Sequence, residues 1–101
     1  MFISVGKDGT VALREGDDFK RLHIEAADGD VSPETVRRAL APHATFEDNS
    51  FWLDVEWLKA LSGRAGDAAW EGSFAVMIAS VRKFGWLSAD GRSVRCHLKT
   101  N

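Results

Sequence analysis

The clearest structural pattern of this chain lies in DAAWEGSFAVMIASVRKFG, residues 67–85. Large apolar side chains recur there at helical spacing, within an arc of about 120°: Trp70, Phe74, Met77, Ile78, Val81 and Phe84. Asp67 precedes them as an N-cap, Gly85 follows as a stop, and Trp86 is expected to fold back on the last turn. The sequence therefore predicts a helix here. Its opposite face carries small side chains, which either admit another backbone or face solvent: Gly72, Ala75 and Ala79.

Two further segments alternate apolar and polar side chains, residues 20–26 (KRLHIEA) and residues 93–99 (SVRCHLK). A period of two is typical of a strand with one buried face. We expect the apolar side chains of both strands to face the helix of residues 67–85: Leu22, Ile24, Val94, Cys96 and Leu98. The polar side chains then share the opposite face: Arg21, His23, Glu25, Arg95, His97 and Lys99.

Turn and cap signals place the remaining elements. Residues 2–5 and 10–14 predict a hairpin, and a three-residue loop that ends at Gly9 sets Val5 opposite Val11. This register gathers the apolar side chains of the hairpin on one face.

Two more helices are predicted between the hairpin and residue 67. The first begins after Ser32, an N-cap followed by proline, and ends near Leu40. Residues 43–49 are irregular and predict a loop, whereas the dense apolar positions of residues 51–61 predict a mostly buried helix that stops at Gly63.

These elements predict an α+β fold in one compact domain, residues 1–101. We expect a small antiparallel sheet, built from the N-terminal hairpin, the strand of residues 20–26 and the strand of residues 93–99, with the three helices packed on one face. An alternative architecture keeps the C-terminal hairpin as a wing on a helical core.

Composition narrows the classes of function. The chain has 13 Lys and Arg against 15 Asp and Glu, a net charge of −2, whereas dedicated nucleic-acid binders usually have a basic excess. Cys96 is the single cysteine, which rules out an internal disulfide and a structural zinc site built from cysteines. A single cysteine is also typical of cytoplasmic proteins, and we expect this location. No apolar run is long enough to span a bilayer. We expect neither a metal nor a cofactor.

The two histidines of the alternating strands form the most specific candidate site in the sequence. If the strands are neighbours, His23 and His97 lie beside Glu25 on one polar surface, where imidazole can transfer protons or bind a metal. Arg95 and Lys99 nearby disfavour a metal cation, and polar side chains on an exposed sheet face are ordinary. Arg21 joins the same surface, so the cluster is equally a candidate for binding a ligand or partner.

Two single residues are weaker candidates. His43 lies in the predicted loop, where catalytic groups often occur, but a surface position after a proline is also ordinary. Trp52, at the expected start of a helix, is a candidate to line a pocket or an interface.

Residues 84–98 (FGWLSADGRSVRCHL) resemble the wing of winged-helix regulators, in which a helix runs through a glycine and a turn into an alternating strand. The resemblance implies that residues 67–85 form a recognition helix and that Arg92 contacts phosphate. Arg92, Arg95 and Lys99 lie within eight residues and are the candidate nucleic-acid contacts of this alternative. The free face of that helix has small residues and Glu71, not the side chains that read base edges.

We therefore expect a small non-catalytic domain that binds a protein partner or a small ligand. A histidine-dependent enzyme or metal-dependent accessory protein and a winged-helix nucleic-acid binder are the alternatives. Nucleic acid and membrane are unlikely partners, and self-association into a homodimer is plausible for a domain of this size.

Overall fold

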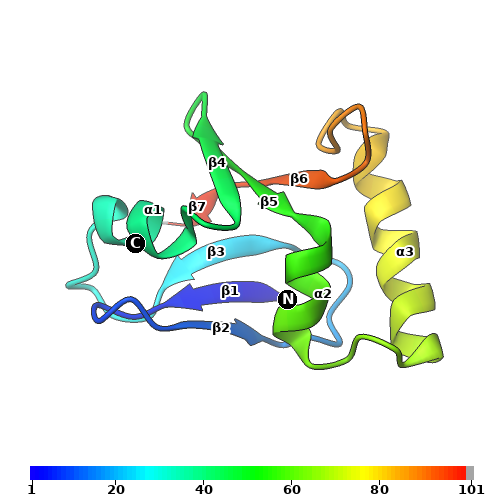
Figure 1. Cartoon of the computed structure of the whole chain (residues 1–101), viewed down its shortest axis with the longest axis horizontal. Helices are drawn as coiled ribbons and strands as arrows, with labels where there is room; N and C mark the ends of the chain where they lie inside the picture. Colours follow the sequence, from blue (N-terminus) through cyan, green and yellow to red (C-terminus); the bar gives the residue numbers. More distant parts are fainter. Residues whose placement is uncertain (100–101) are drawn as a thin grey trace.

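The computed structural model describes residues 1–99, which form two sheets and three helices (Figure 1). The α+β class predicted from the sequence is confirmed. The strands are β1 (Phe2–Val5), β2 (Val11–Arg14), β3 (His23–Ala26), β4 (Ala44–Glu47), β5 (Ser50–Asp54), β6 (Ser93–Cys96) and β7 (Leu98–Lys99). The helices are α1 (Pro33–Leu40), α2 (Val55–Ser62) and α3 (Ala68–Arg82).

The first sheet has the strand order β2-β1-β3-β7 and is mixed, so the expectation of one antiparallel sheet was wrong. The hairpin of β1 and β2 is antiparallel, with Val5 opposite Val11 as predicted. The chain then crosses back through residues 15–22, so β3 runs parallel to β1, and β7 runs parallel to β3. Strand direction depends on that crossing, which the local alternation of side chains does not encode.

The second sheet, β4-β5-β6, is antiparallel and contains residues that we had assigned otherwise. The predicted loop of residues 43–49 is strand β4 and a tight turn, and the predicted helix begins at Val55, not at residue 51. Asp48 and Asn49 adopt φ of 52° and 61°, the left-handed backbone of a two-residue hairpin turn, which Asp and Asn tolerate. The aromatic side chains that follow suit a strand as well as a helix.

Residues 93–99 do not form one continuous strand as expected. The chain leaves the second sheet after β6, passes through His97 and enters the first sheet as β7. The N–H of Ile24 donates to the carbonyl of His97 at 3.0 Å, which holds the crossing point against β3. The predicted facing is largely retained, because Val94 and Cys96 are buried whereas Arg95 is exposed.

Helices α1 and α3 begin at their predicted N-caps, whereas α2 begins at an N-cap that was not predicted, Asp54. The Oγ of Ser32 accepts from the N–H of Thr35, and carboxylates cap the other two helices, Asp54 on α2 and Asp67 on α3. Beyond α3, Gly85 has φ of 75° and the N–H of Trp86 donates to the carbonyl of Val81, as expected of this cap.

The helices do not form one layer on one face, contrary to our expectation. Figure 1 shows α3 upright beside the ends of both sheets, while α1 and α2 lie further along them. All three helices still contribute to one buried cluster with both sheets. Its fully buried side chains are Met1, Ile3, Val5, Ile24, Val36, Leu40, Leu53, Leu58, Phe74, Val94 and Cys96.

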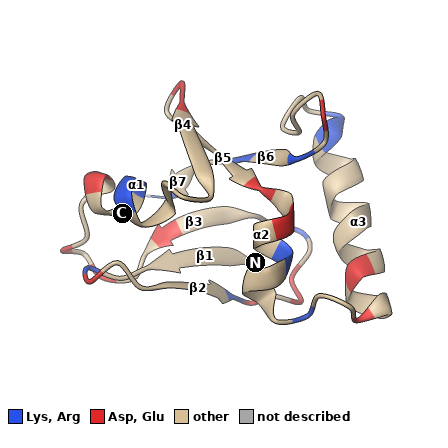
Figure 2. Ribbon diagram, in the orientation of Figure 1, with Lys and Arg blue, Asp and Glu red and all other residues tan. Residues whose placement is uncertain are grey.

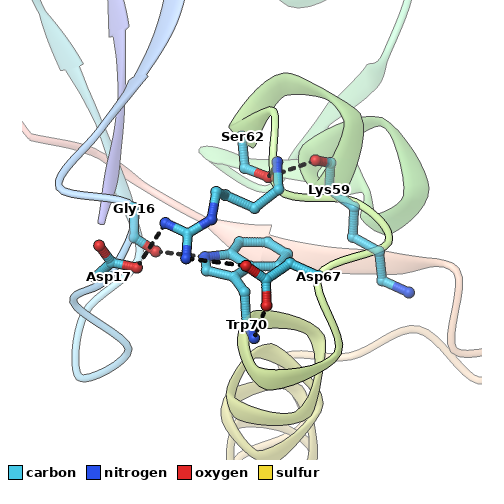
Figure 3. Close-up of polar contacts among 7 residues, drawn as sticks. Gly16, Asp17, Lys59, Ser62, Asp67 and Trp70 are labelled. Atoms are coloured by element: carbon cyan, nitrogen blue, oxygen red, sulfur yellow. Dashed lines mark hydrogen bonds and ion pairs between the residues drawn. The ribbon is translucent and has the colours of Figure 1, made fainter.

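Polar contacts tie the N-terminal end of α3 to the rest of the molecule (Figure 3). The indole Nε1 of Trp70 donates to the carbonyl of Gly16 at 2.9 Å. Arg64 bridges two carboxylates, 3.1 Å from Asp17 and 3.3 Å from Asp67. The loop before β3 is thereby held against the first turns of α3. Among residues 1–99, no helix has the length and apolarity needed to cross a membrane.

Candidate functional site

A cleft of about 420 Å³ lies between the C-terminal half of α3, the segment that leads into β3, and the chain from β6 to β7. Its floor is apolar, and its edges carry charged and aromatic side chains. The lining residues are Phe19, Lys20, Arg21, Leu22, His23, Met77, Ser80, Val81, Phe84, Trp86, Val94, Arg95, His97 and Lys99.

The cleft concentrates positive charge in a chain with a net charge of −2. Its lining includes Lys20, Arg21, Arg95 and Lys99 together with two histidines, and within residues 1–99 no Asp or Glu lines it. Figure 2 shows basic residues on β6, the strand that carries Arg95. Basic groups of one sign around an apolar floor attract an anion and strengthen its binding.

The predicted polar cluster on β3 and β7 is present at the edge of this cleft. The rings of His23 and His97 are stacked with centroids 6.5 Å apart. The Nε2 of His23 lies 3.1 Å from Oε1 of Glu25, and Nζ of Lys99 lies 3.5 Å from the same oxygen. The structure therefore brings together four of the residues that the alternating strands place on one face.

Within that cluster, both His23 and Lys99 lie close to the carboxylate of Glu25. Its contact with His23 lowers the pKa of the Glu25 carboxyl below the ordinary value, and Lys99 acts in the same direction. The Nε2 of His23 is buried and, although it lies 3.1 Å from Oε1 of Glu25, makes no hydrogen bond among residues 1–99. The side chain of His23 is 15% exposed and packs against the ring of Phe2 at 5.3 Å.

Arg95 is held in place on the second sheet. Its Nε donates to Oγ of Ser50 at 2.8 Å, and Ser50 is buried, at 4% exposure. The N–H of Arg95 also donates to the carbonyl of Trp86 at 2.7 Å. This bond ties the strand that carries the arginine to the segment that follows α3.

Two aromatic side chains at the rim were missed by the sequence analysis. Helix α3 ends at Arg82, so Phe84 leaves the buried helix face on which it was predicted and is 64% exposed. Trp86 is 42% exposed and its ring stacks on Phe84 at 4.9 Å. The stop at Gly85 was a signal for this, because residues around a helix end need not continue the helical face.

Three other candidate residues lie apart from the cleft. Trp52 is on β5 and lines a separate shallow hollow with Thr45 and Glu47. His43 stacks flat on Trp57, with centroids 4.5 Å apart, which gives it a packing role. Arg92 follows the turn before β6 and is not among the cleft residues.

The groups that could take part in metal or covalent chemistry are few. Within residues 1–99 there is no group of three or more His, Cys, Asp or Glu side chains placed to hold a metal ion. Burial raises the pKa of the Cys96 thiol to about 12, so this thiol is protonated and shielded at neutral pH.

Comparisons of the chain with models of protein families, with curated proteins and with solved structures found no match.

Proposed function

We propose that this chain is a non-catalytic binding domain and that it takes an anionic ligand in the cleft beside α3. The observation that carries this proposal is the segregation of charge. Six basic or imidazole side chains line the cleft without an acidic one among the described lining residues, although the chain as a whole is acidic. On an ordinary protein surface, positively and negatively charged side chains are mixed.

The apolar floor supports the same reading. Leu22, Met77, Val81 and Val94 line the cleft beneath the charged edge. A site of this kind gains affinity from buried apolar area and specificity from a few placed charges.

The proposal also includes a cytoplasmic location and self-association of the chain. The presence of a single cysteine, Cys96, supports the cytoplasmic location.

The proposal is tested with 8-anilinonaphthalene-1-sulfonate, a dye that combines an apolar ring system with one negative charge. We expect it to bind and to shift the amide NMR signals of cleft residues, including His23 and Arg95. The uncharged analogue N-phenyl-1-naphthylamine reports the apolar contribution alone and should bind more weakly. Dye that shifts no cleft signal, or shifts signals over the whole surface, overturns the proposal.

A matched pair of variants separates the cleft from net charge. Lys20→Glu with Arg21→Glu reverses two charges in the cleft, whereas Lys7→Glu with Arg14→Glu makes the same change on the N-terminal hairpin. Two reversals near a bound anion should weaken the dye about tenfold or more. The hairpin variant should bind the dye as the parent protein does, and equal losses in both variants would contradict the proposed site.

A further inference from the structure

The aromatic and apolar surface around the cleft continues beyond it. Among residues 1–99, three of the four exposed large hydrophobic side chains belong to α3 or the segment after it: Val76 at 70%, Phe84 at 64% and Trp86 at 42%. Phe84 and Trp86 line the cleft, whereas Val76 lies outside its lining on α3. An occupant that covers this surface must therefore extend past the cleft.

Resting on the proposed function, we propose that the occupant is an acidic segment of a protein partner that carries a large apolar side chain. The carboxylates of that segment contact the basic edge, and its apolar side chain enters the floor beside Met77 and Val81. Trp and Arg are enriched among the residues that dominate the binding energy of protein–protein interfaces.

The positions of the basic groups favour several separate carboxylates over one compact anion. Lys20 and Arg21 lie on the segment before β3, Arg95 on β6 and Lys99 on β7. The four basic groups are therefore distributed over three segments of the chain. A single phosphate needs several donors that converge on one point, whereas a polypeptide presents side-chain anions at intervals along its length.

The guanidinium of Arg95 is held in a position from which it can bind a carboxylate of the partner segment. Its Nε is engaged by the buried Ser50, and among residues 1–99 its terminal nitrogens make no hydrogen bond. A guanidinium that is anchored through one nitrogen keeps its remaining donors in a fixed plane, which matches a carboxylate. Less side-chain freedom is then lost when the partner binds.

Single-stranded nucleic acid fits the same surface less well. Its affinity comes from many phosphates and from bases stacked on open aromatic faces. Here the rings of Phe84 and Trp86 stack on each other at 4.9 Å, so each covers one face of the other. A long polyanion would also extend over a surface whose overall charge is negative, whereas a short acidic segment stays within the basic region.

The test is displacement of the anilinonaphthalene dye by peptides of about twelve residues, long enough when extended at about 3.3 Å per residue to span the molecule. The first peptide contains Asp and Glu around two Phe residues. In the second, Asn and Gln replace the acids; in the third, Ala replaces Phe. The fourth competitor is a single-stranded thymidine oligomer of matched charge. Amide NMR shifts show where each one binds.

We expect the acidic Phe peptide to displace the dye and to shift cleft signals together with that of Val76 on α3. Removing the acids or the aromatic rings should each weaken it about tenfold. Added salt should weaken it further, as should the variant Lys20→Glu with Arg21→Glu. The hairpin variant Lys7→Glu with Arg14→Glu should leave peptide binding unchanged.

Each contrary result has a distinct meaning. If the dye occupies the cleft but the acidic Phe peptide does not displace it, the partner inference fails and the proposed function stands. If the oligomer binds as tightly as that peptide, or if the Ala peptide does, the partner inference is overturned. If the dye itself does not enter the cleft, the proposed function fails first.

Discussion

The two ends of α3 use their side chains in opposite ways. At the N-terminal end, polar groups bind within the molecule: Trp70 donates to Gly16, and Lys59 lies 3.3 Å from Glu71. At the C-terminal end, Phe84 and Trp86 are exposed beside a cleft lined with basic groups. One end of α3 therefore binds to the rest of the fold, whereas the segment that follows the other end exposes two aromatic side chains beside basic groups that other elements contribute.

The largest expected effect tests the anchoring end. Trp70→Ala should lower the free energy of unfolding by about 3–5 kcal/mol, because Trp70 is 2% exposed, stacks on Phe74 and loses its bond to Gly16. Urea unfolding followed by circular dichroism measures the change. The control is Trp86→Ala, the same substitution at the other end, which should cost less than half as much. Equal losses would show that the two ends do not differ in this way.

A smaller effect is expected at the binding end. Phe84→Ala should weaken the anilinonaphthalene dye about fivefold, or roughly 1 kcal/mol, through lost apolar contact. Its unfolding free energy should fall by less than about 1 kcal/mol, because Phe84 is mostly exposed. Phe46→Ala, at a second exposed phenylalanine outside the cleft, is the control for dye affinity. A large stability loss in Phe84→Ala would mean that this end also anchors the helix.

Lowering the pH should destabilise the N-terminal end of α3 more than its C-terminal end, and this effect should be smaller than those of the two substitutions. The N–H of Trp70 lowers the pKa of Asp67, and the N–H of Gly66 followed by Lys59 lowers the pKa of Glu71. A carboxyl whose pKa is lower in the folded state stabilises the fold above its unfolded pKa, near 3.8 for Asp67 and 4.5 for Glu71. That contribution disappears as the pH falls through the folded value.

Between about pH 5 and pH 3, amide hydrogen exchange corrected for its intrinsic pH dependence should therefore speed up first around residues 68–72 of α3, by a few-fold. Asp67→Asn with Glu71→Gln removes both titrating groups and should flatten that dependence. Exchange that begins at residues 80–82 instead would contradict the assignment of the acid-sensitive end.

The local signals of the sequence were sufficient for caps and hairpin register. Asp67, Ser32 and the three-residue loop at Gly9 all have the structural roles expected of them. Each depends on residues within one turn or one hairpin. The polar cluster of His23 and His97 could also be anticipated, because it needs only a period of two and the adjacency of β3 and β7.

The remaining features depend on non-local contacts. Residues 50–54 carry aromatic and apolar side chains that fit a buried helix or a central strand, and only pairing with β4 and β6 selects the strand. The hairpin turn at Asp48 and Asn49 lacks the glycine that marks most such turns. The cleft was not anticipated, since it depends on where α3 stands relative to two sheets that local patterns do not orient.

The passage of residues 93–99 from one sheet to the other has a consequence for the order in which the molecule is built. As the chain is synthesised from its N-terminus, β6 and β7 emerge together, and each is needed by a different sheet. Neither sheet can acquire its full set of strands before the other has nearly done so. Partly translated chains should therefore expose open strand edges on both sheets until this segment leaves the ribosome.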